Sequence, residues 1–177
     1  MIYMRPFETA DAPMVAEIIR RNLQEINKKD YTAEQIERWV SFFTSEQLIL
    51  LAQERDIYVI LEGNALAGTA SVTKKIEEDT AYILTVFVLP ELQQKGLGRA
   101  LMAMVEDKAR RNGARYVKVP ASKTARKFYE ILGYTYLDTA ETPDEDGNYM
   151  MQKELGLHGC ESCKSGACNT CEAANCH

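Results

Sequence analysis

The sequence predicts an α/β domain built on a mixed central β-sheet that helices flank on both faces. An apolar run at 82–90 is followed by a turn with two glycines and then by a helical pattern, which predicts strand, turn and helix. A further strand pattern at 115–119 follows that helix, and a right-handed crossover would make these two strands parallel. Two earlier runs, 57–61 and 65–72, predict an antiparallel hairpin. Parallel and antiparallel pairs together make the sheet mixed.

Length, composition and charge limit the possible functions. The 177 residues suffice for one domain with a hydrophobic core and are too few for two, so we assign 1–155 to the domain and 156–177 to a tail. The net charge of −5 argues against a nucleic-acid groove as the main function. The sequence shows neither a signal peptide nor a run of membrane-spanning length. We therefore expect a cytoplasmic protein without a nucleic-acid or membrane partner.

The first elements are predicted from capping signals and apolar spacing. Residues 1–7 predict a strand, and the following helix is expected to begin at Asp11 as its N-cap, with Pro13 in the first turn. A connector at 26–31 leads to a capping-box spacing at 32–35, which predicts a second helix, and a third is expected at 45–53. The side chains expected on the buried face of the first helix are Met14, Ile18, Ile19 and Leu23.

The second helix has one broad apolar face. Its members, Ile36, Trp39, Val40 and Phe43, recur at intervals of three and four residues. The simplest interpretation packs this face against the sheet. Near the end of the domain, short strands are expected at 134–137 and 149–152.

The glycine-rich turn at 93–100 is the strongest sign of a ligand. Gly96 and Gly98 lack the Cβ atoms that would keep a ligand away from the main chain. The first turn of the following helix leaves its N–H groups without intrahelical partners, and the helix dipole makes that end positive. These donors favour a phosphate or diphosphate, and Lys95 and Arg99 add positive charge.

Two common nucleotide-binding turns do not fit these residues. A P-loop needs Lys and then Ser or Thr after its last glycine, whereas Arg99 and Ala100 stand here. A dinucleotide fingerprint needs Gly or Ala in place of Leu101 and an acid at the end of the next strand, where 117–120 has none. Both nucleotide-binding interpretations are excluded.

The turn resembles the acyl-CoA-binding signature of the GNAT superfamily of N-acetyltransferases, in which Gln93, Gly96 and Gly98 match in order. A second GNAT signature is matched by 125–134, so the resemblance covers about residues 1–155. It implies a GNAT-type fold and acetyl-CoA as cosubstrate. The coenzyme-binding residues that it implies on this turn are Gln93, Gln94, Lys95, Gly96, Leu97, Gly98, Arg99 and Ala100.

The resemblance also implies a catalytic role for Tyr129, beside Phe128. From spacing alone Tyr129 is a core tyrosine, but in many GNAT enzymes the tyrosine of this pair faces the sulfur of CoA. A phenol with a pKa near 10 keeps its proton at neutral pH and can donate it to a leaving thiolate. We therefore expect Tyr129 to be the general acid and Phe128 to contact the coenzyme.

Further contacts to the coenzyme are implied by position. In the family, a main-chain N–H at a bulge in the central strand polarises the thioester carbonyl, and the matching residues here are Phe87 and Val88. Ser122 stands where many members have an asparagine that bonds CoA. Its shorter side chain puts that particular contact in question.

No general base is evident in the sequence. Some family members place a Glu on the central strand, but 82–86 contains no carboxylate. The acids Glu77, Glu78 and Asp79 precede the strand, and a solvated acidic turn is the simpler account of them. A water chain would serve equally well as the base.

The resemblance places the acceptor cleft between the first two helices and the loop at 141–148. It implies that Trp39, Tyr31 or Phe42 contacts the substrate, as an alternative to core packing. The acidic loop would attract a cationic amine, although an exposed charged turn explains the same residues. The acceptor is expected to be a small-molecule or peptide amine, and a homodimer stays open as the assembly.

The tail holds every cysteine of the chain. Two Cys-x-x-Cys pairs favour a soft metal such as zinc or copper(I), and the short loop between them is unlike a zinc ribbon. Thiol chemistry or no defined role are the alternatives. The candidate metal ligands are Cys160, Cys163, Cys168, Cys171 and Cys176.

The function that the sequence predicts is transfer of an acetyl group from acetyl-CoA to a primary amine. One alternative is a sensor that binds acyl-CoA without turnover, which the missing carboxylate would permit. Another is a metal-handling protein that acts through its cysteine-rich tail.

Overall fold

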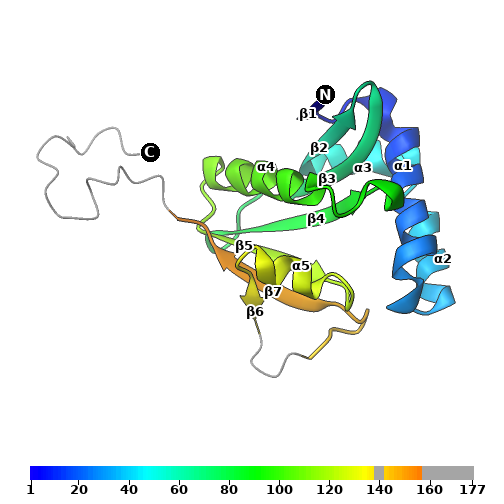
Figure 1. Cartoon of the computed structure of the whole chain (residues 1–177). Helices are drawn as coiled ribbons and strands as arrows, with labels where there is room; N and C mark the ends of the chain where they lie inside the picture. The colour runs from blue at the N-terminus through cyan, green and yellow to red at the C-terminus, as the bar shows by residue number, and fades with distance from the viewer. Residues whose placement is uncertain (138–141, 157–177) are drawn as a thin grey trace, which may run out of the picture.

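The structure, a computed structural model, describes residues 1–137 and 142–156 and confirms the mixed α/β fold (Figure 1). The seven strands form one sheet in the order β1-β2-β3-β4-β5-β7-β6, and β4 and β5 are its parallel pair. The cysteine residues proposed as metal ligands lie outside the described residues. The strands are β1 (Ile2–Pro6), β2 (Arg55–Glu62), β3 (Ala65–Thr73), β4 (Thr80–Val88), β5 (Tyr116–Ala121), β6 (Thr135–Tyr136) and β7 (Tyr149–Glu154).

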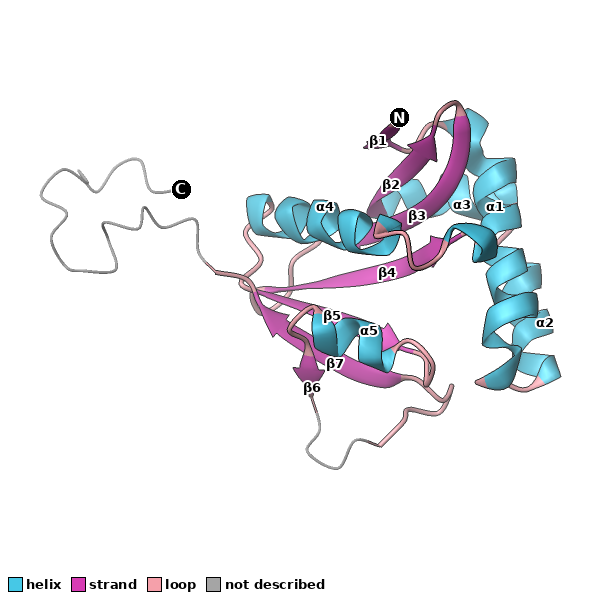
Figure 2. Cartoon of the chain, in the orientation of Figure 1, coloured by secondary structure: helices cyan, strands magenta, loops and turns pink. Residues whose placement is uncertain are grey.

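Helices cover both faces of the sheet, as Figure 2 shows. On one face α4 packs against β2, β3 and β4, and on the other face α1 and α3 pack against the same part of the sheet. The predicted capping box at Thr32 is confirmed, and so is a third helix. No helix in the described part of the chain is long and apolar enough to cross a membrane. The α-helices are α1 (Ala12–Arg21), α2 (Ala33–Phe42), α3 (Ser45–Glu54), α4 (Leu97–Arg111) and α5 (Arg126–Ile131).

The helix α1 begins where predicted, with Asp11 at its N-cap position and Pro13 in its first turn, but the Asp11 side chain has a different role. A short 3-10 turn, η1 (Thr9–Asp11), precedes the helix, and the carboxylate of Asp11 forms no cap with α1. Instead it accepts the Glu8 N–H at 2.8 Å and two hydrogen bonds from Arg5, at 2.6 and 2.9 Å. Asp11 therefore ties the end of β1 to the start of the helical layer.

The buried face of α1 also differs at one position. Ile18, Ile19 and Leu23 are buried as predicted, but Met14 is 45% exposed and Val15 takes its place in the core. Met14 lies four residues before Ile18, as the predicted spacing requires, but the side chain of Val15 faces the sheet instead. Beyond α1, a π-helical turn, η2 (Asn22–Ile26), and a 3-10 turn, η3 (Asn27–Lys29), replace the irregular connector that was expected.

The apolar face of α2 has two roles. Ile36 is buried in the core with residues of α1 and β2, as packing against the sheet requires. Trp39, Val40 and Phe43 are only partly buried against this core. The tryptophan ring meets the Tyr31 ring edge to face at 4.5 Å between centroids. The helix therefore anchors through Ile36 and leaves aromatic side chains at its border.

The Asp11 contact gives a stability prediction. The Arg5 guanidinium, by hydrogen bonding, holds the pKa of the Asp11 carboxyl below its usual value of 3.8. Because hydrogen bonds to a charged, buried group contribute roughly 1.5–3 kcal/mol, Asp11→Asn should lower the free energy of unfolding at neutral pH by about 2 kcal/mol. The stabilisation that the charged Asp11 carboxylate contributes is complete above pH 3.8. It disappears as the pH falls through the lower pKa of this carboxyl in the folded state. Urea unfolding at several pH values measures both effects.

Glu17→Gln is the matched control. Its partner Arg20 and Glu17 itself are both more than 40% exposed, so its removal should cost under about 1 kcal/mol. An Asp11→Asn variant as stable as the wild type at neutral pH would contradict the assigned role of Asp11. So would a difference between the two proteins that persists unchanged in acid.

Candidate active site

A cavity of about 790 Å³ lies where β4 separates from β5. The two strands pair over only three residues of each, from Thr80 opposite Tyr116 to Tyr82 opposite Lys118. Beyond Tyr82 they diverge, as Figure 2 shows, while β5 stays paired with β7 along its whole length. The gap exposes one edge of β4 in the middle of the sheet. The cavity is lined by this edge, by the glycine-rich turn, by α5 and by the segment from η2 to the end of α2.

The bulge in β4 lies slightly earlier than predicted. Phe87 pairs with Thr69 and Leu84 with Ser71, so Thr85 and Val86 together stand opposite Ala70. The bulge is therefore at Thr85 and Val86, and its assignment to Phe87 and Val88 was wrong. Thr85 has a φ of 49°, which is costly for a β-branched residue and marks a locally strained backbone. Strand alternation alone gave no sign of this extra residue.

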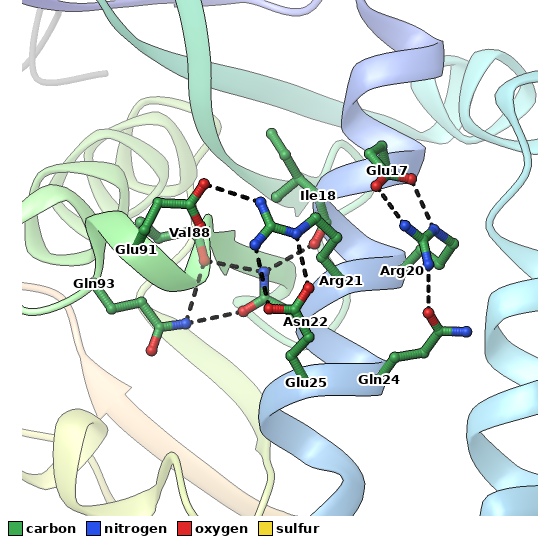
Figure 3. Close-up of polar contacts among 10 residues, drawn as sticks. All are labelled: Glu17, Ile18, Arg20, Arg21, Asn22, Gln24, Glu25, Val88, Glu91 and Gln93. Carbon is green, nitrogen blue, oxygen red and sulfur yellow. Dashed lines mark hydrogen bonds and ion pairs between the residues drawn. The ribbon is translucent and has the colours of Figure 1, made fainter.

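A polar cluster fixes the end of β4 (Figure 3). The Asn22 side chain, buried in η2, donates to the Ile18 carbonyl at 2.8 Å and to the Val88 carbonyl at 3.0 Å. Gln93 donates to Asn22 Oδ1 at 3.0 Å and also to the Val88 carbonyl at 3.2 Å. The side-chain amide of Gln93 therefore links η2 to the end of β4. Its donors face Asn22 and Val88 rather than open space.

The main chain of Val88 faces the gap. The neighbouring Leu89 N–H bonds the Ala67 carbonyl of β3 at 2.8 Å. Because successive residues of a strand direct their hydrogen-bonding groups to opposite edges, the Val88 N–H points away from β3 and toward the cavity. Phe87 and Val88 both line the cavity, as do Leu84, Thr85 and Val86.

The glycine-rich turn places free N–H groups at the cavity. Gly96 is the N-cap of α4 and has a φ of 84°, and the first hydrogen bond of the helix runs from Ala100 N to Gly96 O. The N–H groups of Leu97, Gly98 and Arg99 therefore have no carbonyl partner within the helix. A Cβ on Gly98 would lie 3.3 Å from the Phe128 ring, so this glycine lets α5 approach α4 closely.

The predicted coenzyme residues are divided between the cavity and the core. Leu97 is buried in the hydrophobic core and Lys95 is exposed, and neither side chain lines the cavity, nor does that of Ala100. The main-chain N–H of Leu97 can still take part. The predicted residues that line the cavity are Gln93, Gln94, Gly96, Gly98, Arg99, Phe87, Val88, Ser122, Phe128 and Tyr129.

Tyr129 is 7% exposed and lines the cavity from α5. Its ring packs edge to face on Phe128 and Tyr134, with centroids at 5.2 and 5.6 Å. Burial, and to a smaller degree the nearby Tyr31, raises the pKa of Tyr129 above its ordinary value near 10. The phenol is therefore protonated throughout the physiological range. Both the core interpretation and the cavity interpretation of Tyr129 apply, since its ring is packed and its side chain reaches the cavity.

The segment from Asn27 to Arg38 bridges the two separated parts of the sheet. Asp30 accepts hydrogen bonds from the N–H and hydroxyl of Thr124, at 3.1 and 2.7 Å. Tyr31 donates to the Asn148 side chain, and Arg38 pairs with Asp146. These contacts join the helical segment over β4 to the loops beside β5 and β7. They close one side of the cavity.

Ser122 has a structural role beside the coenzyme contact that the family resemblance implies, which stays a prediction. Its hydroxyl oxygen accepts the Ala125 N–H at 3.3 Å, at the start of α5, and the Asn27 side chain at 3.4 Å. It is 7% exposed. Although it lines the cavity, its hydrogen bonds hold α5 and the connector in place.

The wall of the cavity beside η3 and α2 contains aromatic and polar groups. Tyr31, Trp39 and Phe42 line the cavity, and their contact with an acceptor stays a prediction. Asp146 is the only carboxylate among its described lining residues, and this charge is matched by Arg38. Glu77, Glu78 and Asp79 do not line the cavity, which agrees with a solvated turn.

A short chain of hydroxyl groups ends at the β4 bulge. Ser71 Oγ donates to the Leu84 carbonyl at 3.1 Å and lies 2.7 Å from Thr85 Oγ1. Because Ser71 has one hydroxyl hydrogen, Thr85 is the donor of the second bond. Thr85 lines the cavity, and its Oγ1 keeps lone pairs that can accept a further hydrogen bond.

Sequence reasoning missed three residues of this site: Asn22, Thr85 and Arg55. Asn22 could have been suspected as an asparagine at the end of an amphipathic helix, but its partners are 66 and 71 residues away. Thr85 resembles an ordinary strand residue in the sequence, and Arg55 falls between the expected helix at 45–53 and the expected strand at 57–61. Only the pairing of the strands brings them to the cavity.

Comparisons with known proteins agree with this geometry. The family model described as an acetyltransferase (GNAT) domain matches residues 27–154. A comparison with curated proteins found no match.

Three similar solved structures illustrate the shared fold. The PaiA N-acetyltransferase of Thermoplasma acidophilum in complex with coenzyme A is 20% identical, with a TM-score of 0.76, and the match covers 88% of this chain and 99% of that one. A GCN5-related N-acetyltransferase of Rhodopseudomonas palustris is 24% identical, with a TM-score of 0.73 and coverage of 86% and 95%. YncA of Salmonella typhimurium, a putative acetyltransferase with acetyl-CoA, is 22% identical, with a TM-score of 0.62 and coverage of 90% and 97%. The family match and the fold together show that this chain belongs to the GNAT acetyltransferase family.

Proposed function

We propose that this chain transfers an acetyl group from acetyl-CoA to a primary amine. The observation that carries the proposal is one continuous cavity, which joins the free N–H groups of α4, the separated edge of β4 and the Tyr129 phenol. Membership of the GNAT family supports the same chemistry. Two of the similar structures hold coenzyme A or acetyl-CoA, which further supports an acyl-CoA ligand.

The diphosphate of the coenzyme would lie at the start of α4. The N–H groups of Leu97, Gly98 and Arg99 and the positive end of the helix dipole suit its charge. The exposed Arg99 side chain adds a cation at the cavity. From there the pantetheine arm would enter the gap beside β4, whose exposed edge offers main-chain hydrogen bonds. The Val88 N–H is the donor best placed to polarise the thioester carbonyl.

The reaction exchanges a carbon–sulfur bond for a carbon–nitrogen bond. The neutral amine attacks the thioester carbon, the carbonyl oxygen becomes an oxyanion, and collapse of this intermediate expels the sulfur. Tyr129 donates its proton to the leaving thiolate and recovers a proton from solvent. The proton that the amine loses passes to water. Thr85 Oγ1 would hold the amine by accepting one of its N–H groups.

The glycine turn gives a prediction with an internal control. Gly96 and Gly113 stand at opposite ends of α4 with φ of 84° and 94°, and a Cβ at either position would meet nothing within 4 Å. Alanine at either site should therefore cost about 1 kcal/mol of unfolding free energy, from backbone strain alone. Only Gly96→Ala should also weaken CoA binding, by about tenfold, because it displaces the first N–H groups of the helix.

Calorimetric titration with CoA, beside urea unfolding, separates these effects. Equal CoA affinities for Gly96→Ala and Gly113→Ala would argue against a coenzyme at this turn.

Tyr129 gives a second prediction. In an assay of free CoA released from acetyl-CoA with a panel of primary amines, Tyr129→Phe should lower kcat by about a hundredfold or more and leave the Kd for CoA unchanged. Tyr116→Phe is the control, since Tyr116 lies on β5 outside the cavity lining. Burial raises the pKa of Tyr129, so wild-type kcat should rise with pH as the amine loses its proton, without a decline up to about pH 10.

The outcomes separate the candidate functions. Unchanged turnover in Tyr129→Phe would remove this residue as the acid. Tight CoA binding by the wild type with no CoA released by any amine would favour an acyl-CoA sensor over an enzyme.

A further inference from the structure

Arg55 is a cation of the cavity for which the described residues supply no partner. Arg55 is the first residue of β2 and lines the cavity with Trp39, Phe42 and Phe43. Among the described residues, its guanidinium forms neither a hydrogen bond nor an ion pair within 4 Å, and Glu54 is the only acid whose charge affects it. Asp146, the acid of the described cavity wall, is already paired with Arg38. Arg55 is therefore a charge without a counter-ion in a wall that is otherwise largely aromatic.

The environment of Arg55 makes an anionic ligand favourable. Burial of the side chain lowers the pKa of Arg55, yet a guanidinium stays protonated at any physiological pH. Removing such a cation from water costs free energy unless an anion compensates it. The planar guanidinium offers paired N–H donors that match a carboxylate well. An anionic group that enters the cavity would supply the counter-ion that the described residues do not provide for Arg55.

Arg55 lies on the acceptor side of the site, away from the expected diphosphate. Asp56, the next residue, contacts α4, through Lys108 at 3.5 Å and Asn112 at 3.3 Å. Since neighbouring residues of a strand face opposite sides of the sheet, Arg55 faces the α2 and α3 side. The start of α4, where the diphosphate would bind, belongs to the helix on the other face. The anion that meets Arg55 is therefore carried by the second substrate.

We propose that the acceptor is a primary amine that also carries a carboxylate, and that Arg55 binds this carboxylate while the amine lies near Thr85. This inference rests on the proposed acetyl transfer and narrows its substrate class to amino acids and related amino carboxylates. Asp146, the acid of the 141–148 loop that lines the cavity, has its charge matched by Arg38.

The test compares each amino acid with its own amide, which keeps the amine and removes the negative charge. L-Lysine with L-lysinamide, and β-alanine with β-alaninamide, are titrated calorimetrically into the CoA-loaded protein and then assayed for turnover. At least one acid should bind about tenfold or more tightly than its amide, and the preference should appear in KM rather than in kcat.

Substitutions of Arg55 test whether this side chain causes the preference for the acid over the amide. Arg55→Gln should reduce the acid-to-amide ratio to about one, and Arg55→Lys should keep part of it, since a point charge remains without the paired donors. Arg115→Gln, which removes a half-exposed arginine that pairs with Glu154 outside the cavity lining, should keep the full ratio. Thermal unfolding and a CoA titration establish that each variant is folded.

The results distinguish a wrong role for Arg55 from a wrong assignment of acetyl transfer. Equal binding of acids and amides by the wild type, or a preference that survives Arg55→Gln, would overturn the role of Arg55, even if both kinds of amine were acetylated. Absence of CoA binding and of CoA release would instead overturn the proposed function. In that case, titration of each amino acid and of its amide into the coenzyme-free protein would still test the role of Arg55.

Discussion

The separation of β4 from β5 is the constraint on which this site depends. A strand in the middle of a sheet normally has both edges paired, and unpaired main-chain groups are costly when they are buried. Here β4 and β5 share only three paired residues each, so the rest of one edge must find other partners. Asn22 and Gln93 take the Val88 carbonyl, and the remaining groups open onto the cavity. The interrupted ladder thus becomes a place where an extended ligand can hydrogen-bond.

The gap stays open because both of its sides are held from outside the sheet. The bulge at Thr85 bends β4, and the cluster around Asn22 joins its end to the turn between α1 and α2. On the other side, contacts of Asp30 and Tyr31 hold the loops beside β5 and β7. The structure can therefore keep a cavity open within a continuous sheet.

Much of the fold could be predicted because its signals are local. The glycine turn at Gly96, the capping box at Thr32 and the alternation of the hairpin strands each depend on residues a few positions apart. The features that failed depend on distant partners. Asp11 stands at the predicted N-cap position, but its carboxylate binds Arg5 of β1 instead of an N–H of α1, and the bulge at Thr85 exists only relative to β3. For the same reason, Arg55, which falls between the expected helix at 45–53 and the expected strand at 57–61, was not recognised as a cavity residue.

We propose that the N–H groups at the start of α4, which lack partners within the helix, hold the diphosphate of a coenzyme. Calorimetric titration with CoA, dephospho-CoA and pantetheine tests it most directly, because dephospho-CoA keeps the diphosphate whereas pantetheine has no phosphate. Dephospho-CoA should bind within about tenfold of CoA, and pantetheine should bind about a hundredfold more weakly or worse. Pantetheine binding as tightly as CoA would contradict it.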